Sequence, residues 1–504
     1  MRVTACNGRE VRGRGAYVLY WMIAARRTTS SYGLEHAMAR AQELGVPLLV
    51  LEPLRVGYRW ASDRLHRFVI DGMAANVKAF AKAGITYYPY VEPRPGAGKG
   101  LLAALAKPAA LVVTDEQPGF FLPRMVAAAA AGLDVKLEMI DGNGMLPLRA
   151  HGRVFPTAAA FRWTWQKVIH PHLMAMPMAE PLGHVDRGLK GAQVPAAVLR
   201  KWPEASAALL MGEAAALAAL PIDHEVRPIE RRGGAIAAAA VLKDFVDGRL
   251  DRYGEARSQP DDDVASGLSP YLHFGHVGVH EVARAVWAAA EWDPSRIAER
   301  ANGKREGWWG APPAIESFLD ELITWRELGH GFCFHRDDFD RYESLPEWAR
   351  RSLDAHAGDP RPHRYDRATL EAAATHDPLW NAAQTQLVRE GKIHNYLRML
   401  WGKKILEWSP SPRAALDVLI ELNNRYAVDG RDPNSYSGIF WTLGRFDRPW
   451  APERPVFGVI RYMSSDATAR KLHVKAYLAR YTARPPQGEL FAPPPATKQR
   501  RGRA

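Results

Sequence analysis

The chain has 504 residues, of which 47% are hydrophobic and 24% charged, and this composition excludes a mainly disordered protein. Its length exceeds what one hydrophobic core usually holds, so we expect two domains. Lys and Arg total 67 against 55 Asp and Glu, a formal charge of +12. This excess favours a polyanionic partner, although a basic enzyme without nucleic acid fits the charge equally well.

The cysteine content is low, with only Cys6 and Cys333, far apart in sequence. A disulfide framework or a cysteine-based metal cluster is therefore excluded, and a reducing compartment is indicated. The apolar run 16–25 ends at Arg26 and Arg27 instead of a small-residue cleavage site, and no run has the length of a membrane span. We expect a cytoplasmic protein without a membrane association or obligate protein partner, and a monomer by default.

Short apolar runs alternate with helical patterns over residues 16–175, after a segment 1–15 that we expect to be disordered. This alternation predicts a doubly wound parallel five-stranded sheet, the core of an α/β domain. The predicted strands are Tyr17–Ile23, Pro47–Leu51, Ile85–Val91, Ala110–Thr114 and Val135–Ile140. The predicted helices are Tyr32–Leu44, Ser62–Ala83, Gly100–Ala106 and Leu122–Ala131.

The rest of the chain lacks this alternation. Residues 176–233 are rich in proline and predict an interdomain linker with one Ala-rich helix, Ser206–Ala219. Residues 234–484 have helical patterns almost throughout and predict an all-α domain. Residues 485–504 combine prolines with a basic end and predict a disordered tail.

The segment 376–441 carries the most unusual chemistry, since it combines four tryptophans with an Asn-Asn pair and two aspartates. Trp401 and Trp408 are seven residues apart, so a helix places them on one face. Tryptophan is costly to bury because its indole N–H needs a partner. Large oxidisable rings beside amide and charged groups indicate a cofactor pocket built for electron transfer.

Six motifs occur in one order along the C-terminal half: SGLSPYLHFG (266–275), LDELITWRELGHGFCF (319–334), HDPLWN (376–381), LRMLWGKKILEW (397–408), DGRDPN (429–434) and RPVFGVIRYM (454–463). Together they resemble the class II cyclobutane pyrimidine dimer (CPD) photolyases of the photolyase/cryptochrome superfamily. The resemblance implies an α/β antenna-type domain followed by an all-α FAD-binding domain. It also implies light-dependent repair of DNA containing cyclobutane pyrimidine dimers, by electron transfer from photoexcited reduced FAD. The N-terminal half resembles the family loosely, and it leaves a second, antenna chromophore open: a deazaflavin, a folate, another flavin or none.

The resemblance implies a set of FAD-binding residues. In it, Ser266, Gly267, Leu268 and Ser269 hold the diphosphate, with Tyr253 nearby, whereas the residues alone indicate an ordinary helix N-cap. Arg398 and Asp429 form an ion pair at the flavin, which could equally be a helix-packing salt bridge. Further expected contacts are Asp432 at the isoalloxazine edge or ribityl chain, Asn423 at flavin N5, and Asn395 at the adenine or the lesion.

Three tryptophans match the class II electron-transfer pathway, with Trp401 nearest the flavin and Trp380 and Trp408 beyond it. Their alternative role is core packing. By the same resemblance, Glu321 hydrogen-bonds a carbonyl of the dimer and stabilises its radical anion. The implied substrate contacts are the clamps Trp325 and Trp441, the adaptable Met399, Arg326 toward phosphate or Glu321, and Trp450 at the edge of the DNA-binding face.

Two positions depart from the family, His276 after HFG and the glycines in GHGF (329–332). The chain has no HExxH pair or Cys/His cluster, so we predict no metal site. A cryptochrome-like photoreceptor and a (6-4) photoproduct repair enzyme are rival hypotheses within the superfamily. A flavin- or nucleotide-dependent dehydrogenase is disfavoured because GxGxxG is absent.

Overall fold

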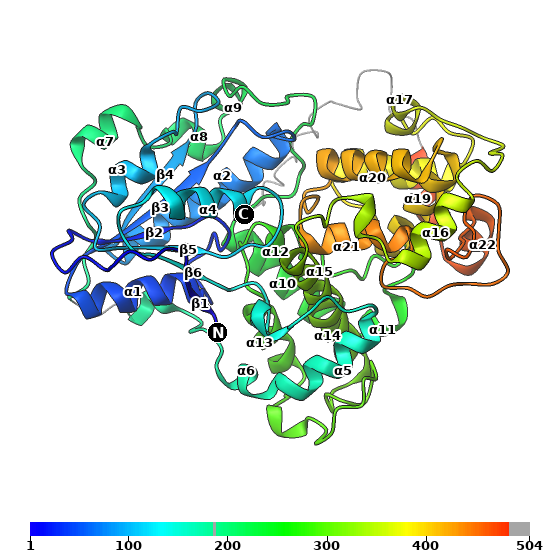
Figure 1. The fold of residues 1–504 in the computed structure, drawn as a ribbon, viewed down its shortest axis with the longest axis horizontal. Coiled ribbons are helices and arrows are strands. Elements are labelled where there is room, and N and C mark those ends of the chain that lie inside the picture. The colour runs from blue at the N-terminus through cyan, green and yellow to red at the C-terminus, as the bar shows by residue number, and fades with distance from the viewer. Residues whose placement is uncertain (185–187, 483–504) are drawn as a thin grey trace, which may run out of the picture.

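A computed structural model describes residues 1–184 and 188–482. An α/β region and an all-helical region lie side by side (Figure 1). The sheet has the strand order β1-β6-β5-β2-β3-β4, and every neighbouring pair except β1 and β6 is parallel. The strands are β1 (Val3–Ala5), β2 (Val18–Trp21), β3 (Leu48–Leu54), β4 (Thr86–Val91), β5 (Leu111–Asp115) and β6 (Leu137–Ile140).

The first strand, β1, is a correction to the prediction of a disordered segment 1–15 and adds a sixth strand to the five expected. It pairs with β6 antiparallel, with Val3 opposite Ile140. Arg2 anchors it by donating to the carbonyl oxygens of Asp141, Gly144 and Met145. Three residues are too few to show a strand period, so the pairing partner creates this strand.

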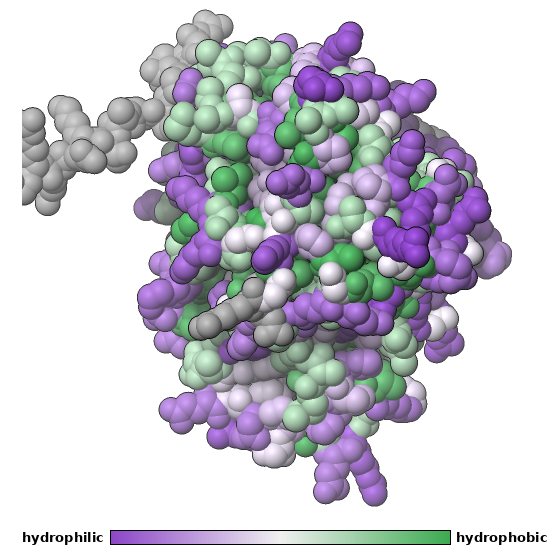
Figure 2. Space-filling view, turned by 90° about the vertical axis from the view of Figure 1, so that its left-hand side faces the viewer, coloured by the Kyte–Doolittle hydropathy of each residue, from purple (hydrophilic) through white to green (hydrophobic). Residues whose placement is uncertain are grey.

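Helices cover both faces of the sheet, as a doubly wound fold requires. The central strands are buried on both sides, which explains their nearly continuous apolar sequences. One face packs against α3 and α4, and the other against α1 and α2. These helices are α1 (Tyr32–Leu44), α2 (Asp63–Lys82), α3 (Leu101–Ala106) and α4 (Leu122–Gly132). Figure 2 shows the molecule from the side of the α/β region, which lies at the left in Figure 1. On this face hydrophilic residues alternate with smaller apolar patches.

The connecting segments pack firmly. The sequence predicts that the α/β domain extends to residue 175, but Phe161 and Trp165 belong to the core of the helical region. The Trp165 indole also donates to Thr324 there. The predicted helix Ser206–Ala219 is two helices, since Gly212 adopts φ 75° and ends the first. The helices are α5 (Ala158–Val168), α6 (His170–Met174), α7 (Ala196–Lys201), α8 (Ala207–Met211) and α9 (Ala214–Ala218).

The helical region begins one residue after Gly234 and is described to Thr482; the predicted tail lies outside the described residues. A π-helical turn, Asp320–Trp325, joins α14 to α15. The helices are α10 (Ala235–Gly248), α11 (Tyr253–Ala256), α12 (Ser269–His273), α13 (Val279–Ala289), α14 (Pro313–Leu319), α15 (Arg326–His335), α16 (Glu347–Ala355), α17 (Arg367–Glu371), α18 (Pro378–Glu390), α19 (Asn395–Trp408), α20 (Pro412–Tyr426), α21 (Pro433–Thr442), α22 (Ser465–Lys471) and α23 (Lys475–Thr482).

Buried polar contacts join the two regions. Arg64 of α2 donates to the carbonyl oxygens of Val388 and Tyr426, near the C-terminal ends of α18 and α20. Glu327 of α15 accepts from the backbone N–H groups of Met145 and Leu146. Among the described residues, no helix has the length and apolar character needed to cross a bilayer.

Candidate functional site: two cavities sharing one helical turn

A polar cavity of about 300 Å³ lies within the helical region, and we call it the central cavity. It brings together segments that are far apart in sequence, including the first turn of α19, the loop before α12 and the loop before α21. Eight of the sequence-predicted site residues line it: Tyr253, Ser266, Gly267, Ser269, Glu321, Asn395, Arg398 and Asp429.

The charges of the central cavity are fixed by local structure. Asn395 and Arg398 are three residues apart at the start of α19, so both face the cavity. Arg398 Nη2 lies 3.2 Å from Asp429 Oδ1, and the two side chains are 23% and 13% exposed. The predicted ion pair is therefore present, on the wall of a cavity.

Glu321 enters the central cavity from the π-helical turn, a feature common at functional sites. Its carboxylate contacts Arg257 of the neighbouring loop, which also lines the cavity. Burial raises the pKa of Glu321 above its ordinary value, while Arg257 opposes that shift. The carboxyl group is thus closer to its neutral, proton-donating form than an exposed glutamate.

One buried polar atom in the wall of the central cavity lacks a partner. His394 Nδ1 has no hydrogen bond within the described parts of the chain. Burial lowers the pKa of His394 to about 4, so the imidazole is neutral at pH 7. An unpaired buried nitrogen is costly unless a ligand satisfies it, and together with Arg398 and the two serine hydroxyls it suits a large polar cofactor.

A second cavity, of about 400 Å³, opens beside the first and combines aromatic rings with cations; we call it the aromatic cavity. The predicted substrate residues Met399, Trp441 and Trp450 line it. Its cations lie over rings: the Arg461 guanidinium is 3.9 Å from the Trp450 centroid and 5.6 Å from that of Trp441. The other lining residues include Tyr396, Arg454, Tyr462 and Lys471.

The first turn of α19 separates the two cavities. Asn395 and Arg398 line the central cavity, whereas Tyr396 and Met399, each one residue later, line the aromatic cavity. One residue turns an α-helix by about 100°, so adjacent pairs point to different sides of the same turn. Because a helix with its side chains is about 10 Å across, groups bound on the two sides are separated by a distance on that order.

The three predicted electron-transfer tryptophans are buried together. Their exposed fractions are 0% for Trp380 and 2% each for Trp401 and Trp408. The Trp380 indole donates to the Trp401 carbonyl oxygen at 3.0 Å, and its ring centroid lies 5.4 Å from that of Trp408. Trp401 follows Arg398 by three residues, on the neighbouring surface of α19. Trp380 thus contacts both Trp401 and Trp408, and we call these three buried residues the tryptophan row.

Other predicted residues lie away from the cavity walls. Arg326 corrects the sequence interpretation: it is buried and donates to the Asn143 carbonyl oxygen at the junction with the α/β region, so it does not reach phosphate. Leu268 is buried in the core. Trp325 is half-buried, as is Glu321 four residues before it, while the residues between them are buried.

Asn423 and Asp432 support the loop that carries Asp429. Asn423 Nδ2 donates to the Gly430 carbonyl oxygen and to Ser435 Oγ, both at 2.9 Å, so it lies behind the cavity wall. Asp432 accepts from the Asn434 backbone and lies 3.2 Å from His273. Burial alone would raise the pKa of Asp432, but His273 and other nearby cations hold it below its usual range.

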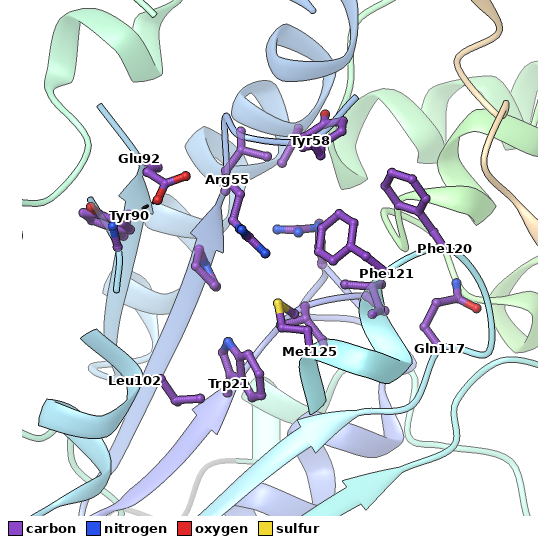
Figure 3. A pocket seen from close by; sticks show the side chains of 18 of the residues that line it. Trp21, Arg55, Tyr58, Tyr90, Glu92, Leu102, Gln117, Phe120, Phe121 and Met125 are labelled. Carbon is purple, nitrogen blue, oxygen red and sulfur yellow. Dashed lines mark hydrogen bonds between the residues drawn. The ribbon is translucent and has the colours of Figure 1, made fainter. Parts of the chain in front are cut away.

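A third, largely apolar cavity of about 450 Å³ lies at the carboxyl ends of β2, β3 and β4 (Figure 3). Trp21 and Leu102 lie on one side, Phe121 and Met125 on another, and the Arg55 side chain points into the space between them. We call it the sheet-end cavity. Ligands of doubly wound folds bind at this end of the strands.

No protein-family model matches the chain. The chain is 33% identical over 479 residues to the deoxyribodipyrimidine photo-lyase of Methanothermobacter thermautotrophicus, covering 95% of this chain and 97% of that protein. It is 33% identical over 477 residues to the deoxyribodipyrimidine photo-lyase of Oryza sativa subsp. japonica, covering 92% and 87%. The chain belongs to the deoxyribodipyrimidine photo-lyase family.

Solved structures agree with the fold of this photo-lyase family member. A class III photolyase from Agrobacterium tumefaciens has a TM-score of 0.66 at 19% identity, covering 93% of this chain and 86% of that one. The Synechocystis cryptochrome has a TM-score of 0.65 at 14% identity, covering 94% and 91%. The predicted α/β region followed by an all-helical region is confirmed, as is membership of an enzyme family.

Sequence reasoning missed several residues of the central cavity, among them Arg257 and His394. Arg257 follows Tyr253 by four residues, and this helical spacing next to a predicted site residue could have identified it. His394 directly precedes Asn395 at the start of α19 but matches no chemical motif. Within the described ranges, no group of three or more His, Cys, Asp or Glu residues is suited to hold a metal ion.

The two departures from the family have structural explanations. His276 is fully buried and stacks on Phe68, and it accepts from the Gly234 backbone N–H. It therefore joins the start of the helical region to α2. The second departure is Gly331, directly before Phe332, where relatives usually carry Asn; a Cβ there would lie 2.4 Å from His151 Nδ1, so the packing of His151 leaves no room for a side chain.

Proposed function

We propose that this photo-lyase family member is a class II-type enzyme that splits cyclobutane pyrimidine dimers in DNA under light. In this proposal FAD occupies the central cavity and the flipped-out dimer occupies the aromatic cavity. The observation that carries it is the first turn of α19, which serves as a wall of both cavities. Donor and acceptor on either side of one helix are separated by on the order of its diameter, about 10 Å, which keeps electron transfer within the protein.

The residues of the central cavity fit FAD. Ser266 and Ser269 offer hydroxyl groups for the diphosphate, and Gly267, at φ 70°, allows the backbone to turn between them. Arg398, held by Asp429, presents a fixed cation, and His394 Nδ1 offers a buried acceptor or donor. Asn395 and Tyr253 complete the wall. When bound, FAD supplies the photoexcitable electron donor for this chemistry.

Glu321 lines the central cavity, and it is proposed to reach the dimer from that side and to stabilise the negative charge that develops on it. Its raised pKa favours the protonated carboxyl, which donates a hydrogen bond to a pyrimidine carbonyl oxygen. Arg257 lies against this carboxyl group and holds its orientation. Asn423 positions the loop that carries Asp429 through its bond to Gly430. These groups position charge and exclude water, and they undergo no net chemical change.

The aromatic cavity is proposed to bind the dimer and the adjacent DNA backbone. Extruding the dimer from the duplex costs stacking energy, which Trp441 recovers on its ring face in this cavity. Met399 adds a soft, adaptable contact. Arg454, Arg461 and Lys471 attract phosphate, and Trp450 borders the same face.

We further propose that the tryptophan row delivers electrons to the central cavity. In this proposal Trp401 is nearest FAD, Trp380 hydrogen-bonds to its backbone, and Trp408 contacts the Trp380 ring farther away. The ring contact of Trp380 with Trp408 at 5.4 Å and its hydrogen bond to the Trp401 backbone favour transfer along the row. In the α/β region, the sheet-end cavity is the candidate position for a second chromophore, since its apolar and aromatic lining suits a planar ring system.

A cryptochrome-like photoreceptor is the alternative function, favoured by the fold similarity to the Synechocystis cryptochrome. The same cavities would then bind a flavin without repairing DNA. The Trp441 and Met399 lining of the aromatic cavity favours repair, because a signalling protein needs no pocket for an extruded base pair.

One experiment separates these functions. Purified protein is examined for a flavin absorbance spectrum, then chemically reduced and mixed with an oligonucleotide that contains a thymine dimer. Repair predicts that illumination restores thymine absorbance, while a dark sample remains unchanged. A flavin spectrum without restored absorbance in light would refute the repair function and favour the photoreceptor.

A further inference from the structure

The tryptophan row ends inside the protein. Trp408, its last member, is only 2% exposed. A positive charge left on this ring after electron transfer therefore has no direct contact with a reductant in solution. Another group must lie between Trp408 and the solvent if the row is refilled from outside.

Tyr365 and His376 occupy that intermediate place. Their ring centroids lie 5.3 Å and 5.5 Å from that of Trp408, and Tyr365 meets it edge-on. Tyr365 is partly exposed and His376 is exposed, so the pair connects the buried indole to the surface. Edge contact at this distance matches the contact between Trp380 and Trp408 within the row, at 5.4 Å.

The hydrogen bonds of the pair define a path for a proton. Tyr365 Oη lies 2.6 Å from His376 Nδ1, and the His376 backbone N–H donates to the same oxygen at 3.1 Å. With the imidazole proton on Nε2, Nδ1 is an acceptor and the phenol O–H donates to it. A phenol that loses an electron becomes a strong acid, so a base at this position allows the proton to leave with the electron.

His376 is suited to accept the proton because it is neutral. Partial burial of the ring, followed by the neighbouring His363, lowers its pKa below the ordinary value of 6.5. His363 stacks on it with a centroid distance of 3.8 Å. The other charged groups that face the imidazole are Asp377 and Glu407, which raise its pKa, and Lys404, which lowers it.

Lys404 also disfavours a positive charge on Trp408. Its ammonium nitrogen lies 5.6 Å from the Trp408 ring centroid. Its ion pair with Glu407, at 2.8 Å, offsets part of this effect. The remaining repulsion favours moving the charge outward from the indole.

We propose that Tyr365 is the terminal electron donor of the tryptophan row and that His376 Nδ1 takes its phenolic proton. This inference rests on the proposed light-driven function. One electron passes from Tyr365 to the Trp408 radical cation and restores the neutral indole. The O–H bond breaks as an N–H bond forms, giving a neutral tyrosyl radical and an imidazolium. A thiol reductant in solution then returns a hydrogen atom equivalent to Tyr365, and His376 releases its proton.

The test uses flavin-loaded protein with oxidised flavin, studied by transient absorption and freeze-trapped electron paramagnetic resonance after a light flash. The variants are Tyr365→Phe, which keeps the ring against Trp408, and His376→Phe. Tyr32→Phe is the matched control, since Tyr32 also lies against a histidine, His280, but in the α/β region. We expect a tyrosyl radical in the wild type and the control, and only a tryptophanyl radical, with at least tenfold faster charge recombination, in both variants.

The outcomes separate this inference from the proposed function. A wild-type protein that forms a tryptophanyl radical but no tyrosyl radical overturns the role of Tyr365 and leaves the proposed function intact. A protein that forms no light-driven radical overturns both. NMR titration of His376 gives a second readout without light: its pKa rises in Tyr365→Phe if the hydrogen bond exists, and an unchanged pKa overturns the proton path.

Discussion

Replacing Trp441 by alanine tests the proposed lesion pocket most quantitatively. Its ring lines the aromatic cavity, 4.9 Å from the Lys403 ammonium and 5.6 Å from the Arg461 guanidinium. Alanine substitution of an aromatic that stacks on a base costs about 1–3 kcal/mol. One indole can cover one pyrimidine of the dimer, so we expect a loss of about 2 kcal/mol, or roughly 30-fold in affinity.

Fluorescence anisotropy in the dark, with a duplex containing one thymine dimer and its undamaged counterpart, measures this loss. Only the dimer-containing duplex should bind more weakly, because phosphate contacts are shared by both. Trp163→Ala is the matched control, since Trp163 is 48% exposed on α5 and lines neither cavity. Because Lys403 is buried against the Trp441 ring, removing that ring could destabilise the fold. Thermal unfolding of the Trp441→Ala variant checks that it still folds. Equal weakening on both duplexes, or none on either, would refute the stacking role.

Three further predictions follow from the same geometry. Trp401→Phe should abolish light-driven reduction of oxidised flavin, seen as unchanged flavin absorbance under illumination with a thiol, whereas Trp163→Phe retains it. Arg398→Ala leaves Asp429 unpaired and should weaken FAD binding by about 2 kcal/mol. Equilibrium dialysis measures this affinity, with the surface variant Arg351→Ala as the control. Equal affinities of the two variants would contradict the role of the ion pair. Burial lowers the pKa of Lys403 from 10.5 to about 7, so the unfolded state binds more protons between these values. The stability of the wild type relative to Lys403→Met should therefore rise with pH across that window, by at most about 1.4 kcal/mol per unit, and a flat difference in urea titrations would exclude it.

The fold was predictable where pattern and packing agree. Five strands and the helices α1 to α4 follow from continuous apolar runs and helical periods, because parallel strands buried on both faces have few polar positions. Strand β1 depends on a partner distant in sequence, so three residues could not reveal it. The break at Gly212 depends on one backbone conformation, which composition alone does not specify.

The candidate site was predictable to the extent that the motifs fix side-chain direction. Regular helical spacing explains why Asn395 and Arg398 line the central cavity while Met399 lines the aromatic cavity. Arg326 was misassigned because it follows the π-helical turn, whose wider hydrogen bonding shifts the direction of later side chains. Arg257 and Tyr365 depend on tertiary contacts, with Glu321 and Trp408 respectively, that lie far along the chain.

The central claim is that the first turn of α19 separates the flavin from the dimer. A crystal structure of the protein with FAD and a dimer-containing duplex, solved in the dark, tests it directly. The account predicts the isoalloxazine ring beside Arg398 and Asp429, and the flipped dimer against Met399 and Trp441. A flavin bound outside the central cavity, or a dimer that remains within the duplex, would contradict the account.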